Sequence, residues 1–169
     1  MIMKPLKIIT DPNKILRQKS VKVKNFDNAL RNLIEKMIFT MQENNGVGLS
    51  AIQIGKPLKI VIVEFAPQLI SKKQRELLNA HQPMPLTILI NPKITKLSKQ
   101  THIAPEGCLS LPDVEVKIER PSEVSIIAQD INGEKIRIRA KNYHARILQH
   151  ELDHLEGVLI IDKAKNAKI

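Results

Sequence analysis

The chain has 169 residues, of which 43% are hydrophobic and 26% are charged, and its formal net charge is +10. This length suits one domain with a sizeable core, and apolar runs such as residues 60–63 are far too short to span a bilayer. The single cysteine excludes an internal disulfide, and one Tyr, three Phe and no Trp leave little to stack on nucleic-acid bases.

The first predicted elements follow an N-terminal segment that has neither a long apolar stretch nor a cleavage site, so a cytoplasmic protein is expected. Residues 27–45 form a helix by the i, i+3, i+4, i+7 spacing of their apolar residues, with Asp27 as N-cap and Asn45-Gly46 at the end. Residues 58–65 are predicted as a strand. Residues 87–91 and 94–98 are predicted as short strands on either side of Pro92.

The segment 66–85 lies between these strands and is hard to assign. It is most simply a surface excursion, with room for a short helix near 71–80 between Pro67 and Pro83. Further along, residues 114–118, 123–129 and 134–140 are predicted to form an antiparallel set. Asn132-Gly133 is a strong hairpin signal between the second and the third of these strands.

The last predicted helix covers residues 142–156 and ends at Gly157. One stripe of this helix carries Tyr143, Ile147, His150 and His154. A neighbouring stripe of leucines, at positions 148, 152 and 155, is expected to face the core. The two histidines therefore lie at the margin between the core and a cleft.

His150 and His154 belong to the pattern His-Glu-x-x-His, in which two imidazoles one helical turn apart can reach one metal ion. Glu151 lies beside that face, where a general base for a metal-bound water is needed. Three protein ligands leave a coordination position open for chemistry, so the identity of the third ligand decides the function.

The third ligand is expected upstream, because Glu156 and Asp162 are the only carboxylates after His154. A metalloendopeptidase that takes a downstream ligand is disfavoured for the same reason, and Ile160 stands where the longer protease pattern has its third histidine. The candidates are Cys108 and the three upstream histidines, at positions 81, 102 and 144. His144 is about 240° around the helix from His150 and faces elsewhere. A lone cysteine is usually a small buried apolar residue, but a histidine pair that lacks a third ligand favours Cys108.

Three segments of the chain resemble one family. The sequence GVGLSAIQ at residues 46–53 resembles the first motif of peptide deformylases, EGCLS at 106–110 the second, and QHELDHLEG at 149–157 the third. Their order and spacing also fit, and the resemblance covers nearly the whole chain. It implies a single catalytic domain over residues 1–169 with an α+β fold. In this fold antiparallel β-sheets pack around a C-terminal metal-binding helix, and the domain also has an N-terminal helix.

The resemblance also implies roles for individual residues. Cys108, His150 and His154 would bind one divalent metal, Fe²⁺ in the cell and Zn²⁺, Ni²⁺ or Co²⁺ in purified protein. A metal-bound water would be the nucleophile and Glu151 the general acid/base, while Gln53 and the backbone N–H of Leu109 would hold the oxyanion. The substrate-binding segments would contain Gly46, Val47, Gly48 and Gly107.

The implied activity is the removal of the N-formyl group from the N-terminal methionine of newly made polypeptides, with release of formate. The implied partners are formylmethionyl nascent chains, without a membrane or sequence-specific nucleic acid. Three positions, Ser50, Ile52 and Pro105, depart from residues common in the family and put the rate in doubt. The alternatives are therefore a catalytically weak relative or a ribosome-associated metal-binding protein, the latter suggested by the net charge and by the basic tail at residues 163–168.

Overall fold

The computed structural model describes residues 4–164 and shows an α+β arrangement around two antiparallel sheets. The larger sheet has five strands in the order β1-β2-β3-β6-β7, and the smaller one pairs β4 with β5. The strands are β1 Gly48–Ser50, β2 Ile60–Phe65, β3 Met84–Leu97, β4 Thr101–Cys108, β5 Leu111–Pro121, β6 Glu123–Gln129 and β7 Lys135–Lys141.

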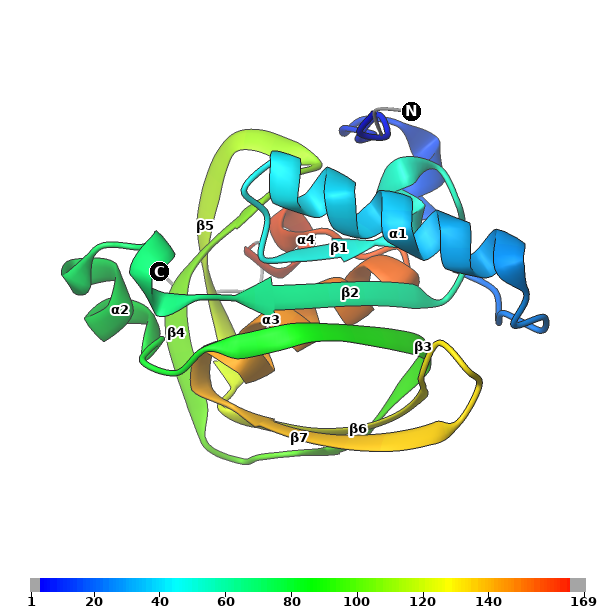
Figure 1. Ribbon diagram of the computed structural model, residues 1–169. Helices are drawn as coiled ribbons and strands as arrows, with labels where there is room; N and C mark the ends of the chain where they lie inside the picture. The colour runs from blue at the N-terminus through cyan, green and yellow to red at the C-terminus, as the bar shows by residue number, and fades with distance from the viewer. Residues whose placement is uncertain (1–3, 165–169) are drawn as a thin grey trace.

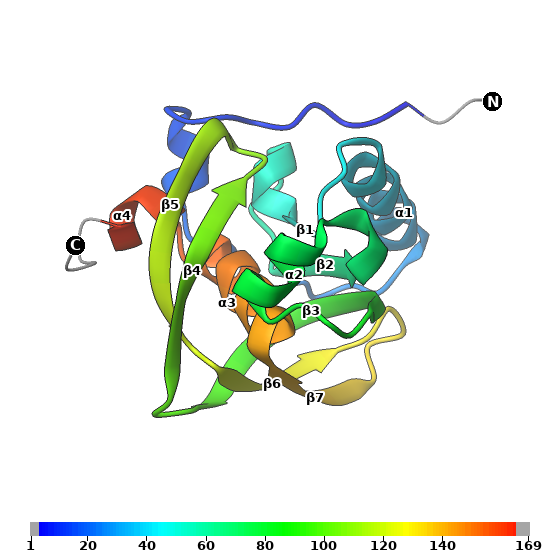
Figure 2. The same cartoon turned by 90° about the vertical axis from the view of Figure 1, so that its left-hand side faces the viewer.

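Two long helices cover opposite faces of the larger sheet. They are α1 Asn28–Glu43 and α3 Asn142–Leu155, and the shorter helices are α2 Lys72–Leu78 and α4 Ile160–Ala164, with 3₁₀ turns η1 Lys14–Arg17, η2 Ala51–Ile54 and η3 Pro67–Leu69. Figures 1 and 2 show α3 lying between the five-stranded sheet and the β4–β5 hairpin. The helix that carries the histidine pair is therefore enclosed by both sheets.

Strand β2, in the larger sheet, is buried on both of its faces. Ile60 and Ile62 pack in the cluster that contains the apolar stripe of α1, whereas Val61 and Val63 pack in the cluster under α3. Alternate residues of a strand point to opposite faces, so a strand buried on both faces needs an unbroken apolar run. The leucine stripe of α3 is buried as predicted.

Most predicted elements are confirmed with small changes of boundary. Asp27 caps α1 by accepting a hydrogen bond from the Leu30 N–H at 2.9 Å, and Gly157 follows α3 with φ 74°. The two short strands around Pro92 are one strand, β3, with an irregular register between Ile90 and Lys93. The short helix near 71–80 is present as α2.

The predicted antiparallel set of three strands is wrong in one respect. Residues 123–129 and 135–141 pair as β6 and β7, but residues 114–118 belong to β5, which pairs with β4 in the separate sheet. No helix in the described part of the chain is long and apolar enough to cross a membrane. Only the start of the basic tail, through Ala164, lies within the described residues.

Candidate active site

Cys108, His150 and His154 converge on one point in the structure. The Nε2 atoms of the two histidines are 3.3 Å apart, and the Cys108 Sγ lies 3.3 Å from the His154 Nε2. The three potential ligand atoms all lie within 4.8 Å of one another, as the residues of a metal site do. Helix α3 supplies both imidazoles one turn apart, and Cys108 comes from the C-terminal end of β4. A thiolate and two imidazoles suit a divalent metal of the zinc and iron type and leave a position open.

The other histidines considered as third ligands do not join this group. His81 lies near Glu76, and its Nε2 is 3.8 Å from the carboxylate. The His144 Nε2 lies 2.9 Å from the Gln82 carbonyl oxygen, on a different side of α3. The carbonyl of His102 accepts a hydrogen bond from Arg146, but its side chain is not part of the cluster.

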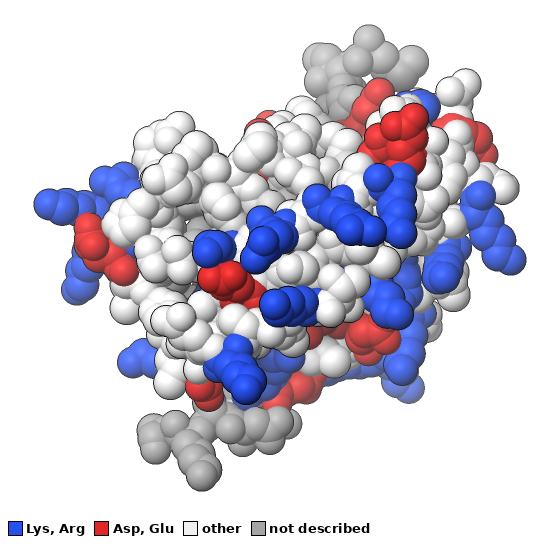
Figure 3. Space-filling model, turned by 90° about the horizontal axis from the view of Figure 1, so that it is seen from below, with Lys and Arg blue, Asp and Glu red and all other residues white. Residues whose placement is uncertain are grey.

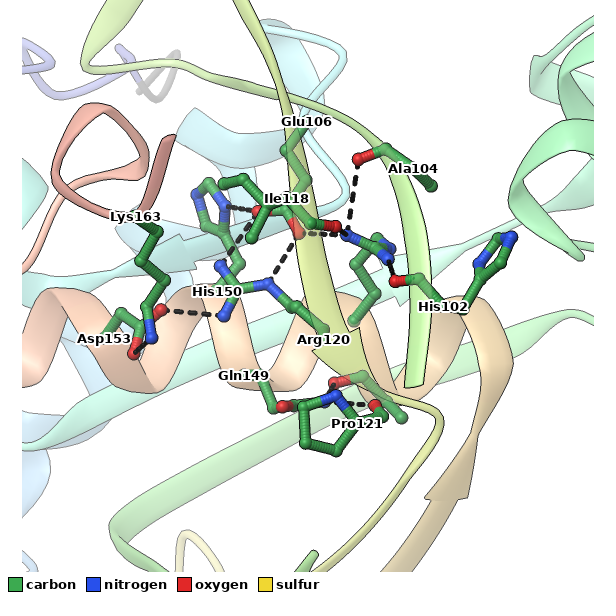
Figure 4. Close-up of polar contacts among 12 residues, drawn as sticks. His102, Ala104, Glu106, Ile118, Arg120, Pro121, Gln149, His150, Asp153 and Lys163 are labelled. Carbon is green, nitrogen blue, oxygen red and sulfur yellow. Dashed lines mark hydrogen bonds and ion pairs between the residues drawn. The ribbon is translucent and has the colours of Figure 1, made fainter. Parts of the chain in front are cut away.

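Glu106 contacts His150 at Nδ1, the ring nitrogen that is not directed at the other two potential metal ligands (Figure 4). Its Oε2 lies 3.1 Å from the His150 Nδ1, so the His150 Nε2 faces the sulfur side. The same carboxylate accepts two hydrogen bonds from Arg120, at 2.5 and 2.9 Å, and one from Arg146 at 2.6 Å. Arg120 also reaches Asp153 at 2.8 Å. A ligand histidine is commonly fixed by such a carboxylate, which sets its tautomer.

The two arginines also fasten the hairpin to α3. Besides Glu106, Arg146 donates to the carbonyl oxygens of His102 and Ile118, which lie on β4 and β5. Both guanidinium groups and the Glu106 carboxylate are almost completely buried. Cys108, two residues after Glu106, is therefore positioned by long-range contacts and not by its local sequence.

The pKa values in the site follow from burial and from these partners. Burial alone would raise the pKa of Glu106, but hydrogen bonds from His150 and Arg120 hold it well below its usual value. Burial would lower the pKa of His150, whereas its hydrogen bonds with Cys108 and Glu106 raise it to about 10. Burial raises the pKa of Glu151 to about 7. A carboxyl group that titrates near neutrality can both accept and return a proton.

Glu106→Gln is expected to weaken both the fold and the metal site. It removes the one carboxylate that Arg120 and Arg146 share, and breaking a buried ion pair costs about 3–5 kcal/mol of unfolding free energy. Loss of an outer partner of a ligand histidine lowers metal affinity by about 10–100-fold. Denaturant unfolding and competition with a chelator measure the two effects. Glu119→Gln, at an exposed position of the same hairpin, is the control and should change neither the unfolding free energy nor the metal affinity. A normal metal affinity in Glu106→Gln would show that Glu106 does not support His150 as a ligand.

Gln53 lies across the site from α3, on η2. It is 1% exposed, and its Nε2 lies 3.7 Å from the Cys108 Sγ and 3.2 Å from the Ser110 Oγ. The Gln53 Oε1 accepts hydrogen bonds at 2.9 Å from both the N–H and the hydroxyl of Ser50. Because two donors occupy Oε1, the amide N–H₂ is directed toward the sulfur. Ser50, a departure from the residue common in the family, thus orients Gln53.

A cavity of about 600 Å³ opens over the metal-ligand group. Its lining includes all of the residues predicted for substrate binding, namely Gly46, Val47, Gly48 and Gly107, together with Gln53, Leu109, Cys108, His150 and Glu151. Ile147, which precedes His150 by one helical turn, also lines it. A larger hollow of about 700 Å³ lies elsewhere and contains none of the three metal-ligand residues.

Several residues of the site had only weak signals in the sequence. Arg146 lies four residues before His150, but a single arginine on a helix is usually solvated. Asp153 and Arg120 both belong to the hydrogen-bonded network around Glu106. Glu106 itself precedes Cys108 by two residues, and in a β-strand that spacing places two side chains on the same face.

Comparisons with known proteins agree with this geometry. The family model described as polypeptide deformylase matches residues 5–169. A peptide deformylase of Bartonella quintana is 40% identical, over 99% of this chain and 88% of that protein. The chloroplastic peptide deformylase 1B of Oryza sativa subsp. japonica is 36% identical over 94% of this chain, which spans only 55% of that relative.

Solved structures of the same family share the fold. The peptide deformylase from Thermotoga maritima has a TM-score of 0.81 and 34% identity, covering 95% of this chain and 97% of that one. A Met-Ala-Ser-bound class I type b peptide deformylase from Acinetobacter baumannii has a TM-score of 0.87 and 29% identity, covering 96% and 99%.

Proposed function

This chain belongs to the polypeptide deformylase family, and on that premise we propose that it hydrolyses the N-formyl group of formylmethionyl peptides and releases formate. The observation that carries the proposal is the group formed by Cys108, His150 and His154. Two of its members, Cys108 and His150, line a cavity together with the buried Glu151. The substrate would be the N-terminus of a newly made polypeptide, in the cytoplasm.

Cys108, His150 and His154 would hold one divalent metal, for which we propose Fe²⁺ in the cell. When bound, the metal supplies Lewis acidity that lowers the pKa of water from 15.7 toward about 7. The protein's own contribution is to fix the ligands, through Glu106 behind His150, and to surround the reacting atoms with buried groups.

Glu151 would accept the proton of the attacking water and pass it to the leaving amine nitrogen. The Glu151 side chain is 3% exposed, and its Oε2 is a buried atom without a hydrogen-bond partner among the described residues. An unpartnered carboxylate oxygen beside the cavity is free to take a proton. Gln53 and the backbone N–H of Leu109 would donate to the formyl oxygen as it gains negative charge, and losing one such donor typically costs about 3–4 kcal/mol.

The peptide would lie along β1, whose outer edge pairs with no other strand among residues 4–164. Residues 46–48 and Gly107 all line the cavity, so an extended chain could pair with backbone groups there. Hydrogen bonds to the backbone do not depend on the sequence of the substrate. A pairing mode of this kind suits an enzyme that must accept many nascent chains.

The direct test is formate release from formyl-Met-Ala-Ser, measured anaerobically with Fe²⁺ and again with Ni²⁺. Acetyl-Met-Ala-Ser is the matched control, because it carries a methyl group in place of the formyl hydrogen. We expect turnover of the formylated peptide only. A metal-loaded protein that releases no formate would contradict the proposed function and favour the catalytically weak alternative.

Gly48→Ala is expected to lower kcat by about 100-fold while the protein still folds, because a displacement near 1 Å can have that effect. A Cβ at Gly48 would lie 2.4 Å from the Glu151 Oε1, so the buried carboxylate would have to move. Gly107→Ala is the comparison, since its Cβ would meet only the Val114 carbonyl oxygen at 3.8 Å. Steady-state kinetics on the formylated peptide should show the larger kcat loss for Gly48→Ala; equal kcat values would reject this account of Gly48.

A further inference from the structure

The outward side of β7 carries basic side chains at alternate positions. Lys135, Arg137 and Arg139 are exposed, while Ile136 and Ile138 between them pack against the core cluster under α3. Sequence alternation of this kind is ordinary for a half-buried strand, so β7 alone would indicate only a solvated face.

The neighbouring strands extend the positive charge across the sheet. Arg137 lies opposite Ile127 of β6, which lies opposite Lys93 of β3, and Arg139 lies opposite Ser125, which lies opposite Lys96. By strand geometry, the row that ends in Arg137 lies about 7 Å along the strands from the row that ends in Arg139. The two cations at the ends of each row are about 10 Å apart across the sheet. We call this surface the basic face and define it by Lys93, Lys96, Lys135, Arg137 and Arg139.

The charges of the basic face are not neutralised by neighbours. Within residues 4–164 its five side chains form no ion pair, whereas the adjacent Lys141 is paired with Glu123 at 3.0 Å. Figure 3 shows the molecule from the side on which β6 and β7 lie in Figure 1, and Lys and Arg side chains gather across it. A hollow of about 330 Å³ lies at the edge of this surface, and its lining includes Lys96, Lys99 and Arg139 together with Glu123, the partner of Lys141.

The basic face is separate from the proposed active site. None of its five residues lines the cavity over Cys108, His150 and His154. In Figure 2, β1, α2 and α3, which carry part of the cavity lining, lie above β6 and β7. A partner bound to the basic face would therefore leave the cavity open to a peptide.

We propose that the basic face docks the protein on the phosphate backbone of ribosomal RNA. The inference rests on the proposed function, because formylated N-termini arise at the ribosome and a polyanionic surface there would bring the cavity close to its substrate. Five unpaired cations on a broad sheet suit several phosphates at once. The chain has no Trp and one Tyr, so base stacking contributes little and binding should not depend on sequence.

An anionic membrane is the less suitable partner for this surface. Binding in a lipid interface adds an apolar face to the positive charge, and the side chains between the cations are Ser125 and the half-buried Ile127. The choice between RNA and lipid is therefore one arm of the test.

The test compares Arg137→Gln/Arg139→Gln with Lys24→Gln/Lys36→Gln, which removes the same charge from exposed positions outside the basic face. Cosedimentation of the metal-loaded full chain with purified bacterial ribosomes, and titration of an RNA duplex of mixed sequence, are measured over a range of salt concentrations. We expect the basic-face variant to bind several-fold more weakly, with a log–log salt slope shallower by about two. The control variant should keep the parent slope.

Activity on free formyl-Met-Ala-Ser separates this proposal from the function. Both double variants should hydrolyse that peptide at the parent rate, because neither pair lines the cavity. If the parent hydrolyses the peptide but neither ribosomes nor RNA distinguish the two variants, the docking proposal is overturned and the function stands. Tighter binding to vesicles that contain phosphatidylserine than to RNA would also overturn it.

Discussion

Replacing Glu151 with glutamine is expected to lower kcat on formyl-Met-Ala-Ser by about 10²–10⁴-fold while the metal stays bound. The carboxylate is the group in the described site that is both buried and unpartnered at one oxygen, and burial raises its pKa to about 7. Glutamine has the same shape but cannot accept and return a proton. Glu151 is outside the three-residue ligand group, so the metal content should not change.

The measurement pairs steady-state kinetics with elemental analysis of the same sample. Glu156→Gln is a suitable control, because that carboxylate follows α3 and is paired with Lys59 at 3.0 Å outside the cavity. It should retain the parent rate. An active Glu151→Gln enzyme with full metal content would show that another group moves the proton.

The elements that were well predicted are those whose sequence period matches their environment. Helix α1 has one apolar stripe and a side-chain cap, and β2 is an unbroken apolar run because both of its faces are covered. The histidine pair was predictable because one helical turn fixes the separation of residues i and i+4. These features depend on local geometry, so a single sequence is enough to find them.

The β4–β5 hairpin was not predictable in the same way. The sequence predicted no strand over residues 101–108, and it assigned residues 114–118 to the wrong sheet. β4 and β5 pair with each other across the short connection at residues 109–110. The position of this hairpin against α3 is fixed by distant contacts, above all by Arg146, which donates to the carbonyl oxygens of His102 and Ile118. Sequence periodicity does not report which of two sheets a strand joins.

The site shows the same division between local and distant information. The resemblance to a family suggested the third ligand, but the residues around Cys108 did not show how its sulfur reaches α3. Glu106 and Arg146 make that connection across 40 residues of sequence, through a buried ion pair. Conversely, in the sequence alone Ser50 is a departure from the family that puts the reaction rate in doubt. In the structure its hydroxyl donates a hydrogen bond to the Gln53 Oε1 and so orients that amide.

Replacing Cys108 with alanine is expected to abolish metal retention, and with it all deformylation. The Cys108 Sγ is the only ligand atom of the group that does not come from α3, and it lies 3.3 Å from the His154 Nε2. Removing it leaves two imidazoles on one helix, so the loss in affinity should exceed the about 10–100-fold that follows from an outer-shell change. The fold should persist, because the Glu106–Arg146 pair that fastens the hairpin to α3 is unchanged.

His81→Ala provides the control, because His81 was a candidate third ligand and lies outside the group. Dialysis against a chelator, followed by elemental analysis, should find metal in the parent and in His81→Ala but not in Cys108→Ala. The Co²⁺-loaded parent should also show a thiolate-to-metal absorption band that Cys108→Ala lacks. If Cys108→Ala keeps its metal through dialysis, then the Cys108 sulfur is not a ligand. The metal site on which the proposed chemistry depends would then have to consist of other residues.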